Sequence, residues 1–294
     1  MTNVTCRNIA VGATGRVAGR RWWWVPAVVP GRPRVFRGGG RAAAGIVLRV
    51  PVLPYALTVS AWLRWDAVSR RLPIDPRSSV LEIGCGLGGL SQLLAERFPY
   101  AAVETDAAAA AAAHVRVRPY GGTVLCGDTG ALEPGFHADV VCAFEVIEHI
   151  EDDRAALRDW AAHVTPGGHL IVTTPADPER FGAADARVGH WRRYDALSLA
   201  ALMSCAGLDQ IDVRHYGGPV SFALDATRQC LARLDARRAP ADQRTATALS
   251  GQLLQPRSAG SARMTRLAAH PAMMMARAFP DRGAGLIAVG RRPD

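Results

Sequence analysis

The fold is decided by residues 80–89, which read Val80-Leu81-Glu82-Ile83-Gly84-Cys85-Gly86-Leu87-Gly88-Gly89. This stretch predicts a buried strand that ends in a glycine-rich turn and leads into a helix over residues 90–97. Glycine lets the backbone approach a ligand closely, and a helix N-terminus presents N–H groups to the same point. Glu82 lies inside the strand, where a carboxylate is costly unless a cation or a donor meets it. The combination favours a small cationic nucleoside as the ligand.

The glycines alone leave the class of cofactor open. Gly84, Gly86 and Gly89 also satisfy the G-x-G-x-x-G pattern of dinucleotide-binding proteins. A nicotinamide enzyme and a methyltransferase therefore explain the loop equally well, and a tight turn without a ligand is a third interpretation. Residues further along the chain separate these alternatives.

The positive charge of the chain is confined to its beginning. The net charge of the 294 residues is +9, and all 35 basic residues are Arg. Residues 1–65 hold ten Arg and no acidic residue, whereas residues 66–294 hold 25 Arg against 26 acidic residues. A nearly neutral domain argues against a nucleic-acid substrate, because phosphate binding needs a basic face on the domain itself.

Composition also divides the chain. Residues 1–50 are rich in Arg, Gly, Ala and Trp, and we interpret them as a basic, disordered N-terminal extension. Weak attachment to anionic lipid or nucleic acid is the functional alternative. Residues 51–294 are expected to form the folded domain. The best membrane-spanning candidate, residues 50–63, has 14 residues, fewer than the roughly 18–20 apolar residues that cross a bilayer. We therefore expect a cytoplasmic protein whose membrane contact, if any, is peripheral.

Strand-like and helix-like segments alternate along the domain. Strands are expected at residues 80–84, 100–104, 123–127, 139–144, 169–174, 210–216 and 285–290. Helices are expected at residues 55–72, 90–97, from 107 onward, 152–163 and 198–206. The alternation predicts an α/β fold with a doubly wound, mostly parallel sheet, in which ligands bind at the carboxyl ends of the strands. Residues 219–280 interrupt the pattern, and we interpret them as a helical insertion before the last strand.

Two acidic residues follow the next strands at that edge. Glu104 ends the second strand, 20 residues after Gly84, where a carboxylate accepts hydrogen bonds from ribose hydroxyls; Asp106 is the fallback. Asp128 follows the third strand, where an acid can accept from an adenine amino group. A helix or turn cap is the alternative role for Asp128.

The segment after the fourth strand carries a resemblance to a known family. That strand is followed by Glu145-Val146-Ile147-Glu148-His149. Together with the glycine loop, Glu104, Asp128 and Pro166-Gly167-Gly168, the segment resembles the class I S-adenosylmethionine-dependent methyltransferases, in particular the small-molecule group that includes the ubiquinone-pathway O-methyltransferases. The resemblance covers about residues 78–217 and the last strand. It implies a Rossmann-like seven-stranded sheet whose last strand is antiparallel.

The resemblance also implies roles for individual residues toward S-adenosyl-L-methionine. The glycine loop and Glu82 would hold the methionine part of this cofactor. Glu104 would hold the ribose and Asp128 the adenine. Two further residues, Phe144 and Glu145, would line the rim beside the methyl group. The loop glycines concerned are Gly84, Gly86 and Gly88.

His149 is the first candidate for a catalytic residue. A hydroxyl acceptor needs a base within hydrogen-bond reach, and a neutral imidazole suits that task at neutral pH. Some relatives with E-x-x-E-H at this place are thought to hold a divalent cation, which would enlist Glu145, Glu148 and His149. Packing or helix capping is a third role for His149. We predict that His149 acts as a base and that the site holds no metal. Metal binding and a packing or capping role remain as alternatives.

A second candidate segment is Gly189-His190-Trp191-Arg192-Arg193-Tyr194. We predict His190 as a catalytic residue and Arg192 and Tyr194 as acceptor-binding residues, with Arg192 binding an anionic group. A loop anchored by Trp191 and Tyr194, with its arginines bound to carbonyl groups, explains the same residues.

Three functions follow from these observations. The leading hypothesis is methyl transfer to oxygen of a small-molecule or amphiphilic acceptor, lipid- or glycan-linked, with the Met-rich insertion covering the acceptor. A helical pair packed on the sheet edge explains the insertion equally well. A nicotinamide-dependent oxidoreductase is the alternative, although a chain without Lys has no Tyr-x-x-x-Lys pair. A non-catalytic scaffold of the same fold is the third. The oligomeric state is left open.

Overall fold

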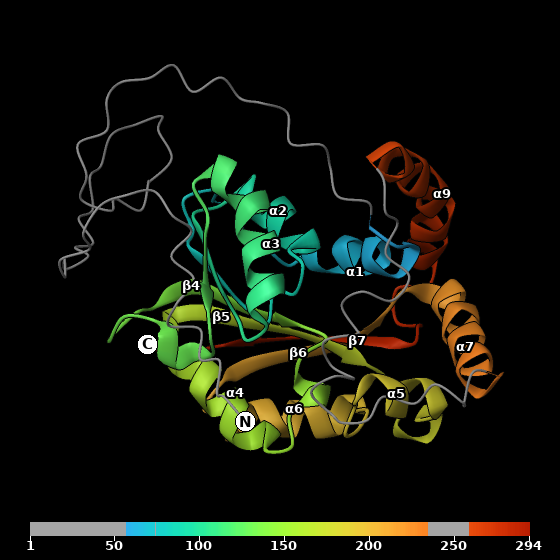
Figure 1. Ribbon diagram of the computed structural model, residues 1–294. Coiled ribbons are helices and arrows are strands. Elements are labelled where there is room, and N and C mark those ends of the chain that lie inside the picture. Colours follow the sequence, from blue (N-terminus) through green and yellow to red (C-terminus); the bar gives the residue numbers. More distant parts are fainter. Residues whose placement is uncertain (1–56, 74, 235–258) are drawn as a thin grey trace, which may run out of the picture.

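The computed structural model describes residues 57–73, 75–234 and 259–294 (Figure 1). The predicted N-terminal extension, residues 1–50, and residues 235–258 of the predicted insertion lie outside this described part of the chain. Among the described helices, none has the length and apolarity needed to cross a membrane.

A single seven-stranded sheet forms the centre of the domain, in the order β3-β2-β1-β4-β5-β7-β6. The strands are β1 (Val80–Ile83), β2 (Tyr100–Glu104), β3 (Thr123–Cys126), β4 (Ala138–Phe144), β5 (Val164–Pro175), β6 (Asp209–Tyr216) and β7 (Gly285–Arg291). Strand β7 lies between β5 and β6 and runs antiparallel to both, whereas the pairings among β1 to β5 are parallel. The predicted α/β class, the mostly parallel sheet and the antiparallel last strand are confirmed.

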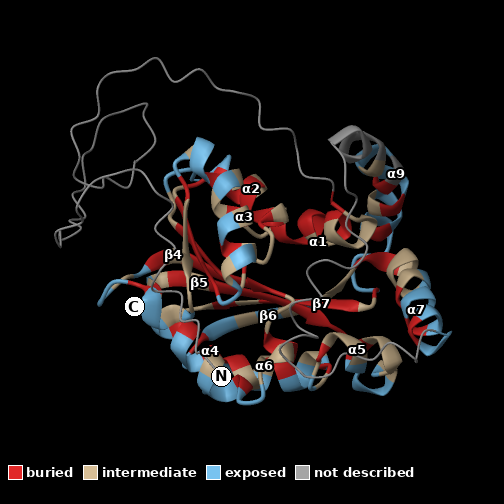
Figure 2. Ribbon diagram, in the orientation of Figure 1, coloured by how far each residue is buried: buried red, intermediate tan, exposed pale blue. Residues whose placement is uncertain are grey.

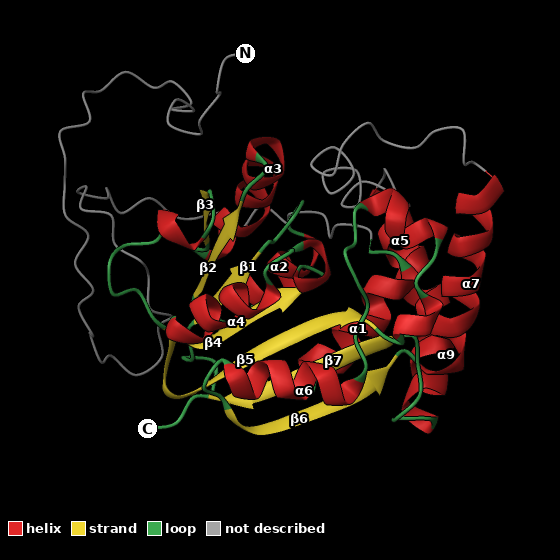
Figure 3. Ribbon diagram, turned by 90° about the horizontal axis from the view of Figure 1, so that it is seen from below, coloured by secondary structure: helices red, strands yellow, loops and turns green. Residues whose placement is uncertain are grey.

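Helices cover both faces of this sheet (Figures 1 and 3). They are α1 (Val59–Ser69), α2 (Gly89–Ala95), α3 (Ala107–Val117), α4 (Asp153–Ala162), α5 (Ala183–Val188), α6 (Ala196–Cys205), α7 (Gly218–Leu234) and α9 (Ala259–Ala278). The helices α1, α2 and α3 lie on one face, and α4 and α6 lie on the other. This is the layered arrangement that the alternating pattern predicts.

The core consists of two apolar layers, one on each side of the sheet (Figure 2). Every residue of β1 and of β2 is buried, as expected for parallel strands covered on both faces. Leu81 packs toward the α4 and α6 side with Trp160, whereas Tyr100 packs toward the α2 and α3 side with Leu94. Each fully buried side chain of this size stabilises the fold by about 1.5–3 kcal/mol.

The strand register brings the predicted site residues to one edge. Ile83 at the end of β1 is paired with Val103 of β2 and with Ala143 of β4. The glycine loop after β1, Glu104 at the end of β2 and Glu145 after β4 therefore meet at the carboxyl edge. The point between β1 and β4 is where the strand order reverses, which is the usual ligand position in such sheets.

Two parts of the fold differ from the prediction. Strand β5 begins at Val164, so residues 166–168, expected as a turn, belong to the irregular start of that strand, where Gly167 has φ 75° and the pairing with β4 shifts register. The short helix α5 was not expected. Six residues carry too little periodicity to distinguish a helix from a loop.

The predicted insertion forms α7 and α9, which pack on each other, while α9 also packs on α1. The carboxylate of Asp66, which is 5% exposed, accepts hydrogen bonds from Nε and Nη2 of Arg277 at 3.0 and 2.7 Å. This charged pair ties α9 to α1, so the insertion lies against the start of the domain.

We expect Gly88→Ala to destabilise the fold more than Gly86→Ala does. Both glycines have positive φ, 78° and 53°, so both variants carry similar backbone strain. A Cβ at Gly88 would lie 2.7 Å from Cα of Ala113 in α3, whereas a Cβ at Gly86 would meet nothing within 4 Å. Overpacking of this kind costs about 1–3 kcal/mol. Urea unfolding of both variants measures the difference, and equal losses would contradict this packing role.

Candidate functional site

The glycine loop forms a cradle at the carboxyl edge of β1. Gly84, Gly86 and Gly88 have φ values of 68°, 53° and 78°, a region that only glycine adopts at little cost. A Cβ at Gly84 would lie 2.7 Å from Cγ2 of Val146 after β4, but a Cβ at Gly86 would meet open space. Gly86 is therefore the position where a ligand can approach the backbone most closely.

Glu104 lies directly against this cradle. Its side chain is 9% exposed; Oε2 accepts a hydrogen bond from the Gly86 amide at 2.7 Å, and Oε1 accepts one from the Asp106 amide at 2.9 Å. A carboxylate offers about four acceptor positions, so positions remain for the hydroxyls of a ligand. Glu104 and the loop are thus neighbours, and the ribose-binding role of Glu104 stays a prediction.

Glu82 has partners within the protein. It is 3% exposed, and its Oε2 accepts hydrogen bonds from the hydroxyls of Ser91 and Tyr100. Burial raises the pKa of Glu82 to about 7. The donors that a carboxylate requires inside a strand thus come from α2 and β2, and contact of Glu82 with the cofactor stays a prediction.

Asp128 caps the short 3₁₀ helix Thr129–Ala131. Its Oδ1 accepts a hydrogen bond from the Gly130 amide at 2.9 Å, and the residue is exposed. The capping alternative thus describes what the structure shows. Adenine binding by Asp128 remains a prediction.

Beyond the buried Phe144 at the end of β4, Glu145 adopts φ 58°. Its carboxylate lies 3.1 Å from Nη2 of Arg64 in α1 and accepts a hydrogen bond from the Tyr216 hydroxyl at 3.3 Å. Burial acts to raise the pKa of Glu145, but the charge of Arg64 and several smaller contributions together outweigh it, so the pKa is lowered. The predicted roles of Phe144 and Glu145 at the cofactor rim stay predictions. Sequence reasoning missed Arg64 and Tyr216, which carry no motif.

Glu148, His149 and His190 form a compact group beside Glu145. Glu148 is fully buried; its Oε2 accepts from the Thr174 hydroxyl at 3.1 Å, while Oε1 has no hydrogen-bond partner among the described residues. Oε1 lies 3.9 Å from Nε2 of His190. The rings of His149 and His190 pack edge to face at 4.6 Å. Both histidines predicted as catalytic are therefore brought together, with a buried carboxyl between them and the sheet.

The electrostatics of this group follow from its burial. Burial, and then the charge of Glu145, raise the pKa of Glu148 well above its usual value. Burial and the neighbouring His190 lower the pKa of His149 to about 4, so its imidazole is neutral at neutral pH. One ligand atom from each of Glu148, His149 and His190 lies within 4.8 Å of the others, so these three residues could hold a metal. The metal-binding alternative from the sequence names Glu145, Glu148 and His149. The structure instead groups Glu148 and His149 with His190.

Arg192 and Tyr194 anchor their loop to α4. Arg192 donates to Oδ2 of Asp153 at 2.7 Å and to the Glu151 carbonyl at 2.8 Å. Tyr194 is 4% exposed, and its hydroxyl donates to the same Asp153 oxygen at 2.9 Å. These contacts favour the anchoring alternative. Acceptor binding by Arg192 and Tyr194 stays a prediction without support from these contacts.

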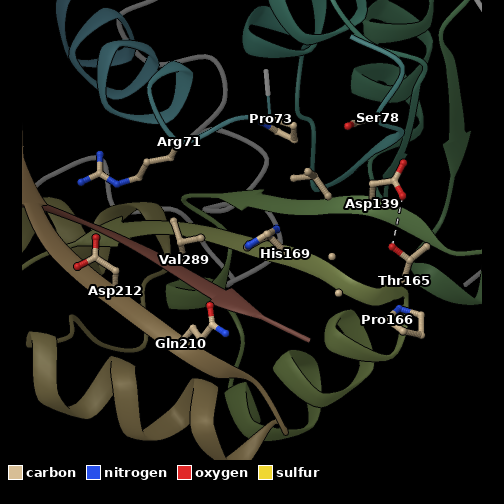
Figure 4. A pocket seen from close by; sticks show the side chains of 13 residues that line it. Arg71, Pro73, Ser78, Asp139, Thr165, Pro166, His169, Gln210, Asp212 and Val289 are labelled. Atoms are coloured by element: carbon tan, nitrogen blue, oxygen red, sulfur yellow. Dashed lines mark hydrogen bonds between the residues drawn. The ribbon is translucent and has the colours of Figure 1, made fainter. Parts of the chain in front are cut away.

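A separate cavity of about 560 Å³ opens at the opposite edge of the sheet (Figure 4). Arg71, Asp139, His169 and Asp212 are among its lining residues. It lies at the amino ends of β4 and β5 and contains none of the predicted site residues. We therefore assign no part of the candidate site to it.

Comparison with known proteins identifies the family. Residues 59–213 match the family described as "Methyltransferase domain". A probable S-adenosylmethionine-dependent methyltransferase of Mycobacterium tuberculosis is 31% identical over 215 residues, which are 68% of this chain and 77% of that protein. An uncharacterized methyltransferase of the same organism is 40% identical over 121 residues, 40% of this chain and 61% of the relative. The chain thus spans about three-fifths of the length of the first curated relatives it matches.

One further relative and two solved structures extend this comparison. The ubiquinone biosynthesis O-methyltransferase of Parvibaculum lavamentivorans is 37% identical over 99 residues, 32% of this chain and 39% of that protein. A methyltransferase structure from Mesorhizobium loti has a TM-score of 0.52 at 15% identity, covering 80% of this chain and all of that one. The cyclase SpnF has a TM-score of 0.53 at 20% identity, covering 80% and 82%. The two structures show the fold alone. By its sequence the chain belongs to the S-adenosylmethionine-dependent methyltransferases, whose cofactor is S-adenosyl-L-methionine.

Proposed function

We propose that this protein transfers a methyl group from S-adenosyl-L-methionine to oxygen of a small-molecule or amphiphilic acceptor. The fold does not decide the reaction, because a cyclase shares it. The observation that carries the proposal is the cradle itself: an open position at Gly86 whose amide is held by the Glu104 carboxylate. This arrangement fits a nucleoside that needs both a close backbone approach and a hydroxyl acceptor.

The residues of the chain have two tasks in such a reaction. When bound, the cofactor supplies an electrophilic methyl group on sulfur. The glycine loop and Glu104 align it, and alignment of donor and acceptor accounts for much of the rate in a displacement of this type. The second task is to take the proton of an acceptor hydroxyl. His149 and His190 stand at the same edge, next to Glu145, and supply imidazole nitrogens for it.

Three observations support oxygen and an amphiphilic acceptor. One relative is named as a ubiquinone biosynthesis O-methyltransferase, and the paired histidines suit a hydroxyl that must lose a proton. The helices α7 and α9 also expose large apolar side chains, namely Leu231, Leu234, Leu267, Met274 and Met275, and Phe279 follows the end of α9. Apolar surface of this kind suits a lipid-like acceptor or contact with a membrane surface.

We expect S-adenosylhomocysteine to raise the melting temperature of the protein and NAD to leave it unchanged. A ligand that binds only the folded state stabilises it by about 2.7 kcal/mol at a hundred times its dissociation constant. A thermal shift with both compounds is sufficient. A response to NAD alone would restore the nicotinamide alternative, and a response to neither would favour a scaffold.

Glu104→Ala is expected to weaken S-adenosylhomocysteine binding by about 1–3 kcal/mol, because hydrogen bonds to a charged acceptor are lost. Asp106→Ala is the matched control. It removes the cap that accepts from the Ala109 amide at 2.7 Å, so it should cost about 1 kcal/mol of stability and leave affinity unchanged. Isothermal titration calorimetry measures both. Loss of affinity in Asp106→Ala alone would transfer the ribose role to that residue.

We expect His149→Ala to reduce methyl transfer while the affinity for S-adenosylhomocysteine stays unchanged, because a lost base affects only the acceptor. A screen of hydroxylated acceptors with isotopically labelled methyl donor identifies the substrate and then measures the rate. Treatment with EDTA should leave the wild-type rate unchanged. A loss of rate on chelation that zinc or manganese restores would replace the base by a cation held by Glu148, His149 and His190.

A further inference from the structure

His190 has a carboxyl group on each side of its ring. Its Nδ1 lies 3.0 Å from Oδ1 of Asp185, and its Nε2 lies 3.9 Å from the unpartnered Oε1 of Glu148. Its backbone amide also donates to the Asp185 carbonyl at 3.0 Å. The side chain is only 11% exposed. The orientation of the ring is thus set by Asp185 rather than by solvent.

Asp185 is 2% exposed, and its carboxylate accepts hydrogen bonds from N–H groups on three neighbouring residues. Arg193 donates to both of its oxygens at 2.9 Å, the Gly182 amide donates at 2.9 Å and the Gln229 side chain donates at 2.7 Å. Both oxygens of Asp185 thus face fixed donors, and the two contacts with the charged guanidinium of Arg193 favour the ionised carboxylate. An ionised carboxylate can only accept. Nδ1 of His190 must therefore carry a hydrogen, and the lone pair of the neutral ring lies on Nε2.

The helix α7 supplies the support for Asp185. Gln229 of α7 donates to Asp185 through Nε2 and accepts from the Ala184 amide through Oε1 at 2.9 Å. Asp225, one turn earlier, accepts from Nη2 of Arg193 at 2.8 Å. Asp225, Gln229 and Arg193 are all buried. The predicted insertion thus contributes a buried polar network that ends at His190, a function beyond covering the sheet edge.

We propose that Asp185 is a positioning residue that holds His190 with its hydrogen on Nδ1, so that the Nε2 lone pair faces Glu148 and the acceptor side of the site. Hydrogen bonds from the far nitrogen commonly set the tautomer of a functional histidine. The importance of this tautomer for catalysis rests on the proposed methyl transfer. The tautomer itself can be measured without any acceptor.

The Asp185→Asn variant tests the proposal, because the surrounding donors determine which way the new side-chain amide is oriented. At the Oδ2 position, an NH2 group would face three donors, from Gly182, Arg193 and Gln229. At the Oδ1 position it would face one fixed donor, Nε of Arg193, and the His190 ring. His190 can accept if its hydrogen moves to Nε2. We therefore expect the amide to turn its NH2 toward His190 and to reverse the tautomer.

The experiment is long-range ¹H–¹⁵N NMR of ¹⁵N-labelled full-length protein at about pH 8.5, where ordinary histidines are neutral. The His190 signals are assigned by their loss in His190→Gln. The wild type should show a protonated Nδ1 and a bare Nε2, and Asp185→Asn should show the reverse. Asp153→Asn is the matched control, because it alters another buried carboxylate that holds this loop but does not contact His190. Its His190 tautomer should be that of the wild type.

A wild-type spectrum with the hydrogen on Nε2 would overturn the proposal, and so would an unchanged tautomer in folded Asp185→Asn. If Asp185→Asn does not fold, the wild-type spectrum still decides. The same samples receive S-adenosylhomocysteine in a thermal shift. If S-adenosylhomocysteine does not raise the melting temperature of the wild type, that result counts against the proposed function alone. The tautomer result is then unaffected. In a serine-protease triad the same substitution produces the wrong tautomer and lowers turnover about 10⁴-fold, so a large loss of methyl transfer is expected once an acceptor is known.

Discussion

The candidate site depends on a backbone constraint at the end of β1. Three glycines of the turn have positive φ, and two neighbouring residues pack closely against the turn. Val146 after β4 lies where a Cβ of Gly84 would be, and Ala113 of α3 lies where a Cβ of Gly88 would be. Because the loop is fixed from both sides, the Gly86 amide between them reaches Glu104. The contacts that pack the loop against β4 and α3 thus also determine the shape of the cradle.

Four glutamates near this edge have different partners, and the partners decide the pKa shifts of Glu82, Glu145 and Glu148. Glu82 is buried among hydroxyls, which leaves its pKa raised to about 7. Glu145 is kept ionised by Arg64, at the cost of a left-handed backbone that is unfavourable by about 1–2 kcal/mol for a residue with a side chain. Glu148, three residues on, is fully buried, and burial together with the charge of Glu145 raises its pKa. Glu104 is bound by backbone amides.

The sequence predicts those features that depend on residues close together in the chain. The bounds of β2 and the start of α3 follow from an apolar run that ends at an acid, with Asp106 capping the helix. The meeting of Glu104, the loop and Glu145 at one edge follows from parallel pairing alone. Arg64, Tyr216 and Asp185 could not be predicted, because their partners depend on tertiary packing. Arg64 lies 81 residues from Glu145, and only the packing of α1 against the carboxyl edge brings them together. No sequence signal shows that Asp153 binds both Arg192 and Tyr194, so the sequence leaves acceptor binding and anchoring of the loop as alternatives.

The position of β7 has a consequence for how the polypeptide matures. In the described part of the chain, β6 joins the sheet only through β7, which is made last. During synthesis, residues 80–175 can pair and collapse as soon as they leave the ribosome. Strand β6 must wait for about seventy further residues before it gains a partner. Until then its unpaired backbone is exposed, and Arg214 with Asp212 on that strand supplies the charge that discourages pairing with other nascent chains.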